Sequence, residues 1–476
     1  MYNALPFPPR CPMPRRSTLV EFRRLGVLAV PIVIAQLSHM GMGVADAVMA
    51  GRLSATDLAG VTLGGNFYWP TMLLLSGIVM AVTPSVSQLN GAGRAEQAGA
   101  VVRQALWIAV CGGVLLMLLL RNAEPAYLLF GVDERAIPVA VGYLKAASPA
   151  LVPLLAYGAL RYLAEGMSWT VPAMVIGLTA LPLKILFNWL FMYGWPALGI
   201  PALGGVGCGW ATTVVMTYSL VVMTVVVANS RLSASNVFKA FSWPQLQEIR
   251  RLLVVGVPIG LALLVEVGLF ATVGLLVGRL GVETVASHQI AFNVAGIAFM
   301  IPLALGMAST IRVGFNVGAR DLPAARLSAW VATATTLSWG FAMGAVMLAF
   351  RHPIVALYTD DPEVVRLAAA LLALGALFQV FDATQATVMG ALRGYKSTGV
   401  PMLIAVVAYW LVGLPIGAGL CFGLGGVPPL EAALTSVFGA FDPLGVRGLW
   451  WGLVVGLALA AVALVGWMMR VSRVRD

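Results

Sequence analysis

Charged side chains are scarce in this sequence. Only 10% of its 476 residues are Asp, Glu, Lys or Arg, whereas 60% are hydrophobic and the mean hydropathy is +0.93. A soluble domain usually carries about 25% charged residues, so this chain cannot cover a water-facing surface. A soluble enzyme and a disordered chain are therefore excluded. The composition predicts a polytopic helical membrane protein with room for about a dozen spans.

Cysteine, histidine and lysine are also rare. The four cysteines form no C-x-x-C pair and the three histidines are dispersed, so neither a disulfide framework nor a metal site is predicted. None of the four lysines follows a glycine, which excludes the phosphate-binding G-x-x-x-x-G-K-[ST] loop, and H-E-x-x-H, G-x-S-x-G and TVGYG are absent as well. We therefore expect no cofactor and no enzymatic activity.

The apolar residues fall into separate runs of membrane-spanning length. These run approximately over 25–50, 58–86, 100–120, 137–160, 170–194, 205–228, 252–278, 285–315, 327–350, 366–390, 400–422 and 447–469. The fold class that follows is all-α, with twelve transmembrane helices in two six-helix bundles. We expect a cytoplasmic tail (1–20), an N-terminal lobe (21–228), a cytoplasmic linker (229–249) and a C-terminal lobe (250–476).

The distribution of basic residues predicts the orientation. If both termini are cytoplasmic, 20 of the 29 Lys and Arg residues fall on the cytoplasmic side and 7 on the other, with Lys145 and Lys184 inside spans. This bias follows the positive-inside rule. Basic residues scattered between apolar runs do not suggest a nucleic-acid partner.

The chain contains an internal repeat. RRLGVLAVP (23–31) aligns with RRLLVVGVP (250–258) at an offset of 227 residues, and the same offset places Gly91 on Gly318. Repeats of six spans each have the same orientation, which is typical of transporters with ligand sites at or between their halves, although a channel can be duplicated too. The matched Pro31 and Pro258 interrupt the first helix of each half and are hinge candidates, or else fixed kinks.

Three acids lie inside spans, where a carboxylate costs about 2.5–3.5 kcal/mol and is by default a functional candidate. Glu266 lies 15 residues after Arg251, about 22 Å along a helix, and Asp382 lies at a similar depth. These two acids could share a cation or a proton, or serve as hydrogen-bonded packing groups. The third acid, Asp46, lies near the outer end of the first span.

Several segments together resemble one transporter family. They are ADAVMAG (45–51), NFYWP (66–70), TPSVSQLNGAGR (83–94), HQIAFN (288–293), IPLALGMASTIRVGFNVG (301–318) and ALRGYKSTGVP (391–401). The chain resembles the multidrug and toxic compound extrusion (MATE) transporters, in particular their NorM-like bacterial branch. The resemblance implies cation efflux driven by an inward proton or sodium gradient, with two lobes that rock between outward- and inward-open states.

The resemblance also implies roles for individual residues. It places cation-binding acids at Glu266 and Asp382, a proton switch at Asp46, and a polar neighbour of that switch at Asn188. Lys184 departs from the family pattern, which has a neutral residue there. Since Lys184 and Asn188 are four residues apart, they share one helix face. We expect Lys184 to take the place of a sodium ion beside Asp46 and to be released when Asp46 is protonated. A lysine that extends to the interface is the alternative.

Four further residues are candidates for the wall of a substrate cavity. Phe378 and Phe381 flank Asp382 and could hold an organic cation through cation–π attraction, although they could equally be core or lipid-facing. Gln289 and Asn293 belong to the family-like HQIAFN segment, where packing also accounts for them.

The sequence as a whole predicts a secondary-active exporter of organic cations and drugs in the bacterial inner membrane, with both termini cytoplasmic. Protons are the expected coupling ion and sodium is the second candidate. No obligatory protein partner is expected. One alternative is a lipid-linked saccharide flippase of the same superfamily, which should need a basic cavity for pyrophosphate. Another is an ion channel, which would show uncoupled flux.

Overall fold

The computed structural model describes residues 17–129, 135–423 and 444–473, and it is helical throughout the twelve predicted spans. The spans are α1 (Thr18–Leu53), α2 with α3 (Ala55–Met80, Val82–Gly91), α4 (Ala98–Arg121), α6 with α7 (Ile137–Ala147, Leu151–Gly166), α8 (Val171–Tyr193), α9 (Val206–Asn229), α10 (Leu246–Val277), α11 (Val282–Gly318), α12 (Leu322–Ala349), α14 (Pro362–Gly394), α15 with η6 and α16 (Gly399–Val406, Val407–Gly413, Leu414–Phe422), and α18 (Val446–Val471). The predicted all-α membrane fold is confirmed.

Local sequence signals explain where these helices begin and break. Asp321 and Asp361 cap α12 and α14, because their carboxylates accept hydrogen bonds from backbone N–H groups of the first turn. The second span was expected over 58–86 but continues from Ala55 to Gly91, with a break at Ala81. Pro84 explains the break, since a proline lacks the N–H that would continue the α2 hydrogen-bond ladder.

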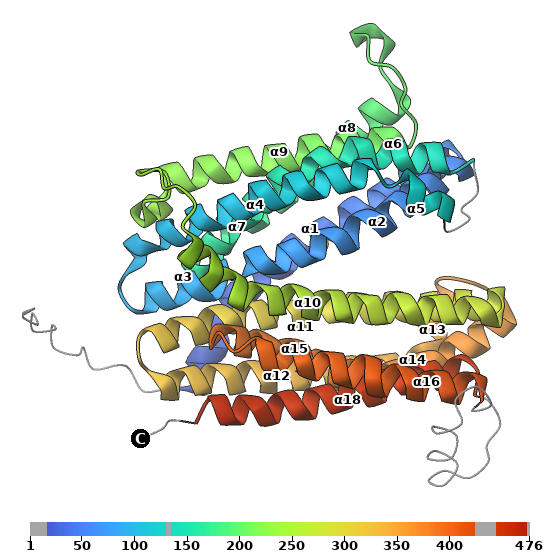
Figure 1. The fold of residues 1–476 in the computed structure, drawn as a ribbon. Coiled ribbons are helices and arrows are strands. Elements are labelled where there is room, and N and C mark those ends of the chain that lie inside the picture. Colours follow the sequence, from blue (N-terminus) through green and yellow to red (C-terminus); the bar gives the residue numbers. More distant parts are fainter. Residues whose placement is uncertain (1–16, 130–134, 424–443, 474–476) are drawn as a thin grey trace, which may run out of the picture.

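The helices form two groups that lie side by side (Figure 1). We call α1 to α9 the N-terminal lobe and α10 to α18 the C-terminal lobe. The lobes contact each other mainly through α1 with α11, α2 with α10 and α3 with α11, and we call this contact surface the seam. The lobes lie closest at the end of the molecule where α1 begins and α18 ends, which we call the terminal end (Figure 1).

Glycines allow the close contact at the seam. A Cβ atom on Gly91 of α3 would lie 1.8 Å from the Phe315 carbonyl oxygen of α11, and a Cβ atom on Gly318 would lie 1.9 Å from the Gln88 carbonyl oxygen. Gly91 and Gly318 are repeat equivalents, so the two backbones approach one another through the same residue on both sides. Any larger side chain at either position would separate the lobes at the terminal end.

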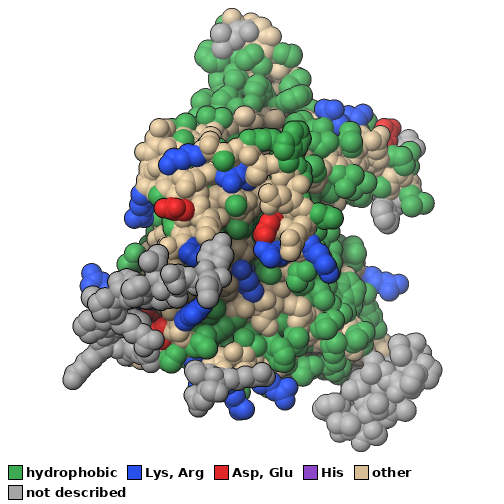
Figure 2. Space-filling view, turned by 60° about the vertical axis from the view of Figure 1, so that its left-hand side comes forward, with side chains coloured by type: hydrophobic (Ala, Val, Ile, Leu, Met, Phe, Trp, Pro, Cys, Tyr) green, Lys and Arg blue, Asp and Glu red, His purple; other side chains and the backbone are tan. Residues whose placement is uncertain are grey.

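The terminal end also carries much of the basic charge. Figure 2 shows that Lys and Arg side chains outnumber Asp and Glu on the face turned toward this end. The predicted linker lies here: η4 (Arg231–Ser235) is followed by a segment held by α4, whose Arg103 donates hydrogen bonds to Ser242 Oγ and the Asn236 carbonyl. Most of the predicted tail (residues 1–16) lies outside the described residues.

Candidate functional site

The N-terminal lobe contains a buried polar cluster where α1, α8 and α9 meet. Asp46 of α1 faces two side chains of α8: Lys184 Nζ lies 3.0 Å from Asp46 Oδ1, and the Asn188 amide donates a hydrogen bond to the same oxygen at 2.6 Å. The four-residue spacing of Lys184 and Asn188 places both on the α8 face that packs against α1. The structure thus brings together the three polar residues proposed for this lobe.

The ammonium group of Lys184 has an acceptor for each of its three donors. Besides Asp46, it donates to the Cys208 carbonyl at 2.9 Å and to Thr212 Oγ1 at 2.6 Å, both on α9. Lys184 is only 2% exposed, so an unpaired ammonium here would carry a large desolvation cost. The interpretation of Lys184 as a lysine that reaches an interface does not fit these contacts. Sequence reasoning missed Thr212, because no pattern links α9 to α8.

A cavity of about 240 Å³ adjoins this cluster. Asp46 and Lys184 form part of its wall together with His39 of α1 and Asn66 and Trp69 of α2. The ion pair therefore borders a space that small solutes can occupy. Its volume is below the range of about 300–1,000 Å³ that is typical of sites for drug-sized molecules. The arrangement therefore suits a proton or a small cation better than a drug.

The C-terminal lobe contains the second cluster. Glu266 of α10 and Asp382 of α14 lie close enough for their charges to repel each other. Gln385, one turn after Asp382, donates a hydrogen bond from Nε2 to Glu266 Oε1 at 3.0 Å. Asp382 is 4% exposed and Gln385 is 1% exposed. The structure thus brings the two acids together, in a lobe separate from Asp46.

Several polar atoms around these acids have no hydrogen-bond partner among the described residues. They are both amide atoms of Gln379, Asp382 Oδ1, Gln385 Oε1 and the Tyr409 hydroxyl. Tyr409 lies in η6, a π-helical segment, and such segments occur often at functional sites. Unpaired buried groups in this number call for an explanation, and a site that binds a proton or a cation provides one. Gln379 and Gln385 could have been found from their three-residue spacing around Asp382, whereas Tyr409 could not.

The four predicted cavity residues lie on α11 and α14 of the C-terminal lobe. Phe378 is 3% exposed and packs against Phe270 and Trp450, with ring centroids 6.1 and 5.8 Å apart, so it is a core residue in this conformation. Phe381 is half-buried against the same core. Gln289 and Asn293 are exposed neighbours on α11, joined by a 3.2 Å hydrogen bond.

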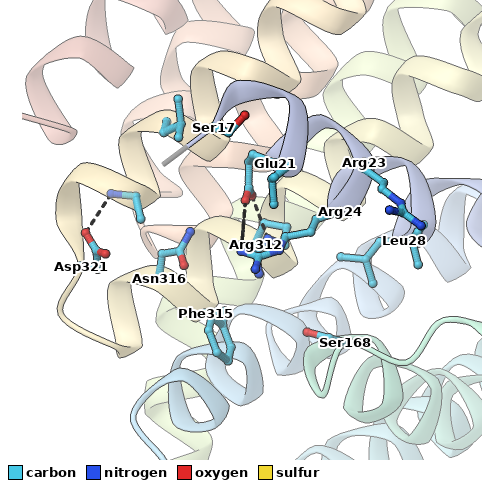
Figure 3. A pocket seen from close by; sticks show the side chains of 14 residues that line it. Ser17, Glu21, Arg23, Arg24, Leu28, Ser168, Arg312, Phe315, Asn316 and Asp321 are labelled. Carbon is cyan, nitrogen blue, oxygen red and sulfur yellow. Dashed lines mark hydrogen bonds and ion pairs between the residues drawn. The ribbon is translucent and has the colours of Figure 1, made fainter. Parts of the chain in front are cut away.

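A third polar cluster lies in the seam at the terminal end (Figure 3). Arg312 of α11 binds Glu21 of α1 with two hydrogen bonds of 2.8 Å, and Ser328 of α12 donates a third to Glu21 at 2.7 Å. Glu21 is 5% exposed although it lies in the first turn of α1, and the pair borders a cavity of about 800 Å³. Sequence reasoning missed this ion pair, because an acid at the end of a span looks solvent-exposed.

The hinge candidates Pro31 and Pro258 both lie inside continuous helices, α1 and α10. Pro31 is buried, whereas Pro258 is half-buried and borders a small cavity beside Arg393. Their matched positions are consistent with the repeat.

Comparison with known protein families gives a match to the MatE family model. The match covers residues 31–190 and again residues 258–418, which is most of both halves. The two matches start at Pro31 and Pro258, the equivalent prolines of the repeat.

Similar proteins are known from bacteria. The chain is 42% identical to the multidrug resistance protein PmpM of Pseudomonas aeruginosa over 459 residues, which cover 96% of this chain and 93% of PmpM. It is 41% identical to the multidrug resistance protein MdtK of Yersinia pseudotuberculosis over 449 residues, covering 94% of this chain and 95% of MdtK.

The fold is similar to solved structures at much lower sequence identity. The eukaryotic MATE transporter AtDTX14 matches with a TM-score of 0.82 at 22% identity, over 95% of this chain and 96% of AtDTX14. A multidrug resistance MATE transporter solved in an outward-facing conformation also matches with a TM-score of 0.82, at 18% identity and the same coverage.

Proposed function

This chain belongs to the MatE family of multidrug and toxic compound extrusion transporters, and from this membership we propose that it exports organic cations from the bacterial cytoplasm in exchange for protons. Membership makes it a multi-pass membrane transporter and not an enzyme. Drugs are the proposed cargo because PmpM and MdtK are named multidrug resistance proteins.

The two acids inside spans, half-buried Glu266 and buried Asp382, are the observation that carries this proposal. Two neighbouring carboxylates from different hydrophobic spans favour a bound positive charge, which either protons or an organic cation can supply. Because one cluster cannot hold both at once, binding of one ligand releases the other. Gln385 holds Glu266 in place for this exchange, and Asp382 keeps an oxygen without a hydrogen-bond partner among the described residues.

The N-terminal cluster favours protons over sodium as the coupling ion. A sodium ion beside Asp46 would lie next to the ammonium group of Lys184, which is 3.0 Å from Asp46 Oδ1, and the two positive charges would repel each other. A proton avoids this conflict, since protonation of Asp46 removes the negative charge that holds Lys184. In the proposed cycle, the breaking of this pair is the switch in the N-terminal lobe.

Coupling requires that the two ligands prefer different arrangements of the lobes. The lobes meet at the terminal end through the Gly91 and Gly318 contacts and the Glu21–Arg312 pair. We propose that transport alternates between this arrangement and one in which the terminal end separates, with Pro31 and Pro258 as hinges. The basic terminal end is assigned to the cytoplasm by the positive-inside rule, which places both termini there.

Purified protein in liposomes tests this function. A fluorescent organic cation and a trapped pH dye would be followed while a proton gradient or a sodium gradient is imposed separately. We expect uphill cation movement driven by the proton gradient and lost in Asp382→Asn. Glu363→Gln, an exposed acid at the start of the same helix, is the matched control and should transport normally.

Each other outcome has a distinct meaning. Uphill movement driven by sodium alone would keep the exporter function and reject proton coupling. Cation movement that only follows the concentration gradient of the cation itself, whichever ion gradient is imposed, would indicate a channel. Absence of cation flux under both gradients would reject organic cations as the cargo.

A further inference from the structure

A second large cavity lies at the terminal end, across the seam between the two lobes. Its volume is about 890 Å³, and its wall comes from α3, α4 and the connection between them in the N-terminal lobe, and from α10 and the turn after α14 in the C-terminal lobe. Four basic residues line it, namely Arg94, Arg250, Arg251 and Lys396, together with one acid, Glu248. The cavity thus has a strong excess of positive charge and receives it from both lobes.

This cavity is the repeat equivalent of the one that contains the Glu21–Arg312 pair (Figure 3). At the 227-residue offset of the repeat, Glu21 corresponds to Glu248 and Arg24 to Arg251. The residue equivalent to Arg312, however, is Ser85. The second cavity therefore lacks the arginine that joins the lobes in the first.

Two further replacements add positive charge to the second cavity. The equivalent of Asp321 is Arg94 at the repeat offset. Ser168 and Lys396 also correspond by position, since each lies two residues beyond the end of its helix, α7 or α14, with a φ of 58° or 57°. Both cavities thus contain the equivalent glutamates (Glu21 and Glu248) and the equivalent arginines of the same helices (Arg24 and Arg251). Asp321 and Ser168 of the first cavity, however, are replaced by Arg94 and Lys396 in the second.

Within the described residues, little neutralises these charges. Glu248 forms an ion pair with Arg251 of its own helix, and Arg94 donates a hydrogen bond to the uncharged amide of Gln97. No carboxylate within ion-pair distance is found for Arg250 or Lys396 in the described parts of the chain. Loss of hydration, together with neighbouring Arg251, lowers the pKa of Lys396, as expected for a cation without an anionic partner.

Part of the remaining wall is apolar. Leu89 and Val101 from the N-terminal lobe and Leu252 and Val255 from α10 form it, and Val254 of α10 is 64% exposed on the outside of the bundle. A ligand that fits this cavity has an anionic head beside the arginines and an apolar chain along α10. Basic pockets between transmembrane helices on the cytoplasmic side bind anionic lipid headgroups by the same physical principle.

We propose that this cavity is a binding site for the phosphate headgroup of an anionic phospholipid, which joins the two lobes at the place where an Arg312 equivalent is missing. The phosphate neutralises Arg94 from one lobe and Arg250 and Lys396 from the other. The bound lipid thus stabilises the arrangement in which the terminal end is closed. Lipid binding is measured directly, without a transport assay. The outcome of this test therefore does not depend on the cargo or the coupling ion proposed above.

Lipid titration of the purified full-length protein, followed by native mass spectrometry, tests this site. The probes are phosphatidylglycerol, phosphatidylcholine and inorganic phosphate. We expect phosphatidylglycerol to bind in preference to the other two. We expect Arg250→Gln combined with Lys396→Gln to weaken this binding by roughly 30-fold, since each basic group near an anionic headgroup contributes about 1 kcal/mol.

Two control variants make the test specific. Arg23→Gln combined with Arg24→Gln removes the same charge from the equivalent cavity and should leave phosphatidylglycerol binding unchanged. Arg250→Lys keeps the charge and should retain binding, which separates a charge effect from misfolding. Equal binding of phosphatidylcholine, undiminished binding in the double glutamine variant, or an equal loss in the Arg23/Arg24 control would each overturn the proposal. Occupancy by inorganic phosphate as strong as that of the lipid would reject a lipid site as well.

Discussion

The Glu21–Arg312 pair should control how readily the lobes separate at the terminal end. It is the ion pair that joins α1 to α11 across the seam, and both side chains are mostly buried, at 7% and 12% exposure. Glu21→Gln keeps the size of the side chain and one oxygen for the hydrogen bond from Ser328, but removes the charge that Arg312 binds with two hydrogen bonds. Arg312 would then be a nearly buried cation without its partner.

The size of the effect follows from this geometry. Removing one partner of a buried ion pair typically costs about 3–5 kcal/mol, and the partial exposure of Arg312 favours the lower end of this range. Arg312 regains hydration when the lobes separate, so the cost is specific to the closed terminal end. About 3 kcal/mol would shift the equilibrium toward the separated state by a little over 100-fold.

Distance measurements between spin labels can detect this shift. Labels at Ala92, at the end of α3, and at Arg326 on α12 are both exposed and lie in different lobes, in a background without native cysteines. We expect one short distance in the parent protein and a substantial population at longer distance in Glu21→Gln. Charge exchange, Glu21→Arg with Arg312→Glu, should restore much of the short distance.

The matched control is Glu248→Gln, the repeat equivalent of Glu21. Its ion pair with Arg251 lies within the largely exposed start of α10 and does not cross the seam, so its loss should leave the distances unchanged. The reasoning is refuted if Glu21→Gln leaves the distance distribution unchanged, or if Glu248→Gln shifts it equally.

Three further substitutions test the remaining clusters through unfolding in detergent. Lys184→Met should destabilise the protein by about 3 kcal/mol and impair transport, because it leaves the Asp46 carboxylate inside a span without its cation. Lys145 is exposed, so the control variant Lys145→Met should change neither stability nor transport. Gln385→Leu should lower the free energy of unfolding by about 1–2 kcal/mol, because it removes the amide that donates a hydrogen bond to Glu266. Transport should also decrease in this variant. Gly91→Ala should destabilise by about 1–3 kcal/mol through overpacking at the seam, whereas Gly26→Ala, which meets open space, should be neutral or stabilising. Equal effects of a variant and its control, or unchanged transport in Gln385→Leu, would contradict these assignments.

The sequence by itself determined the class of protein and its candidate acids. A chain with 10% charged residues and twelve long apolar runs has to place these runs in a membrane, and within the membrane every backbone polar group must be satisfied by helix formation. An acid in such a run stands out because its burial is costly, which is why Asp46, Glu266 and Asp382 could be chosen without a structure. The four-residue spacing of Lys184 and Asn188 also fixed their common face.

Only the tertiary structure decided which helices face one another, and with them the partners of these groups. The apolar pattern of a membrane helix says little about its neighbours, because lipid and protein interiors are similarly apolar. Cys208 and Thr212 as partners of Lys184, Tyr409 beside the two acids and the core position of Phe378 therefore required the fold. The same holds for the seam, where an acid at a span end is buried because α11 of the other lobe brings an arginine to it. Contacts between residues that are distant in sequence depend on how the two lobes pack, and no local pattern encodes that packing.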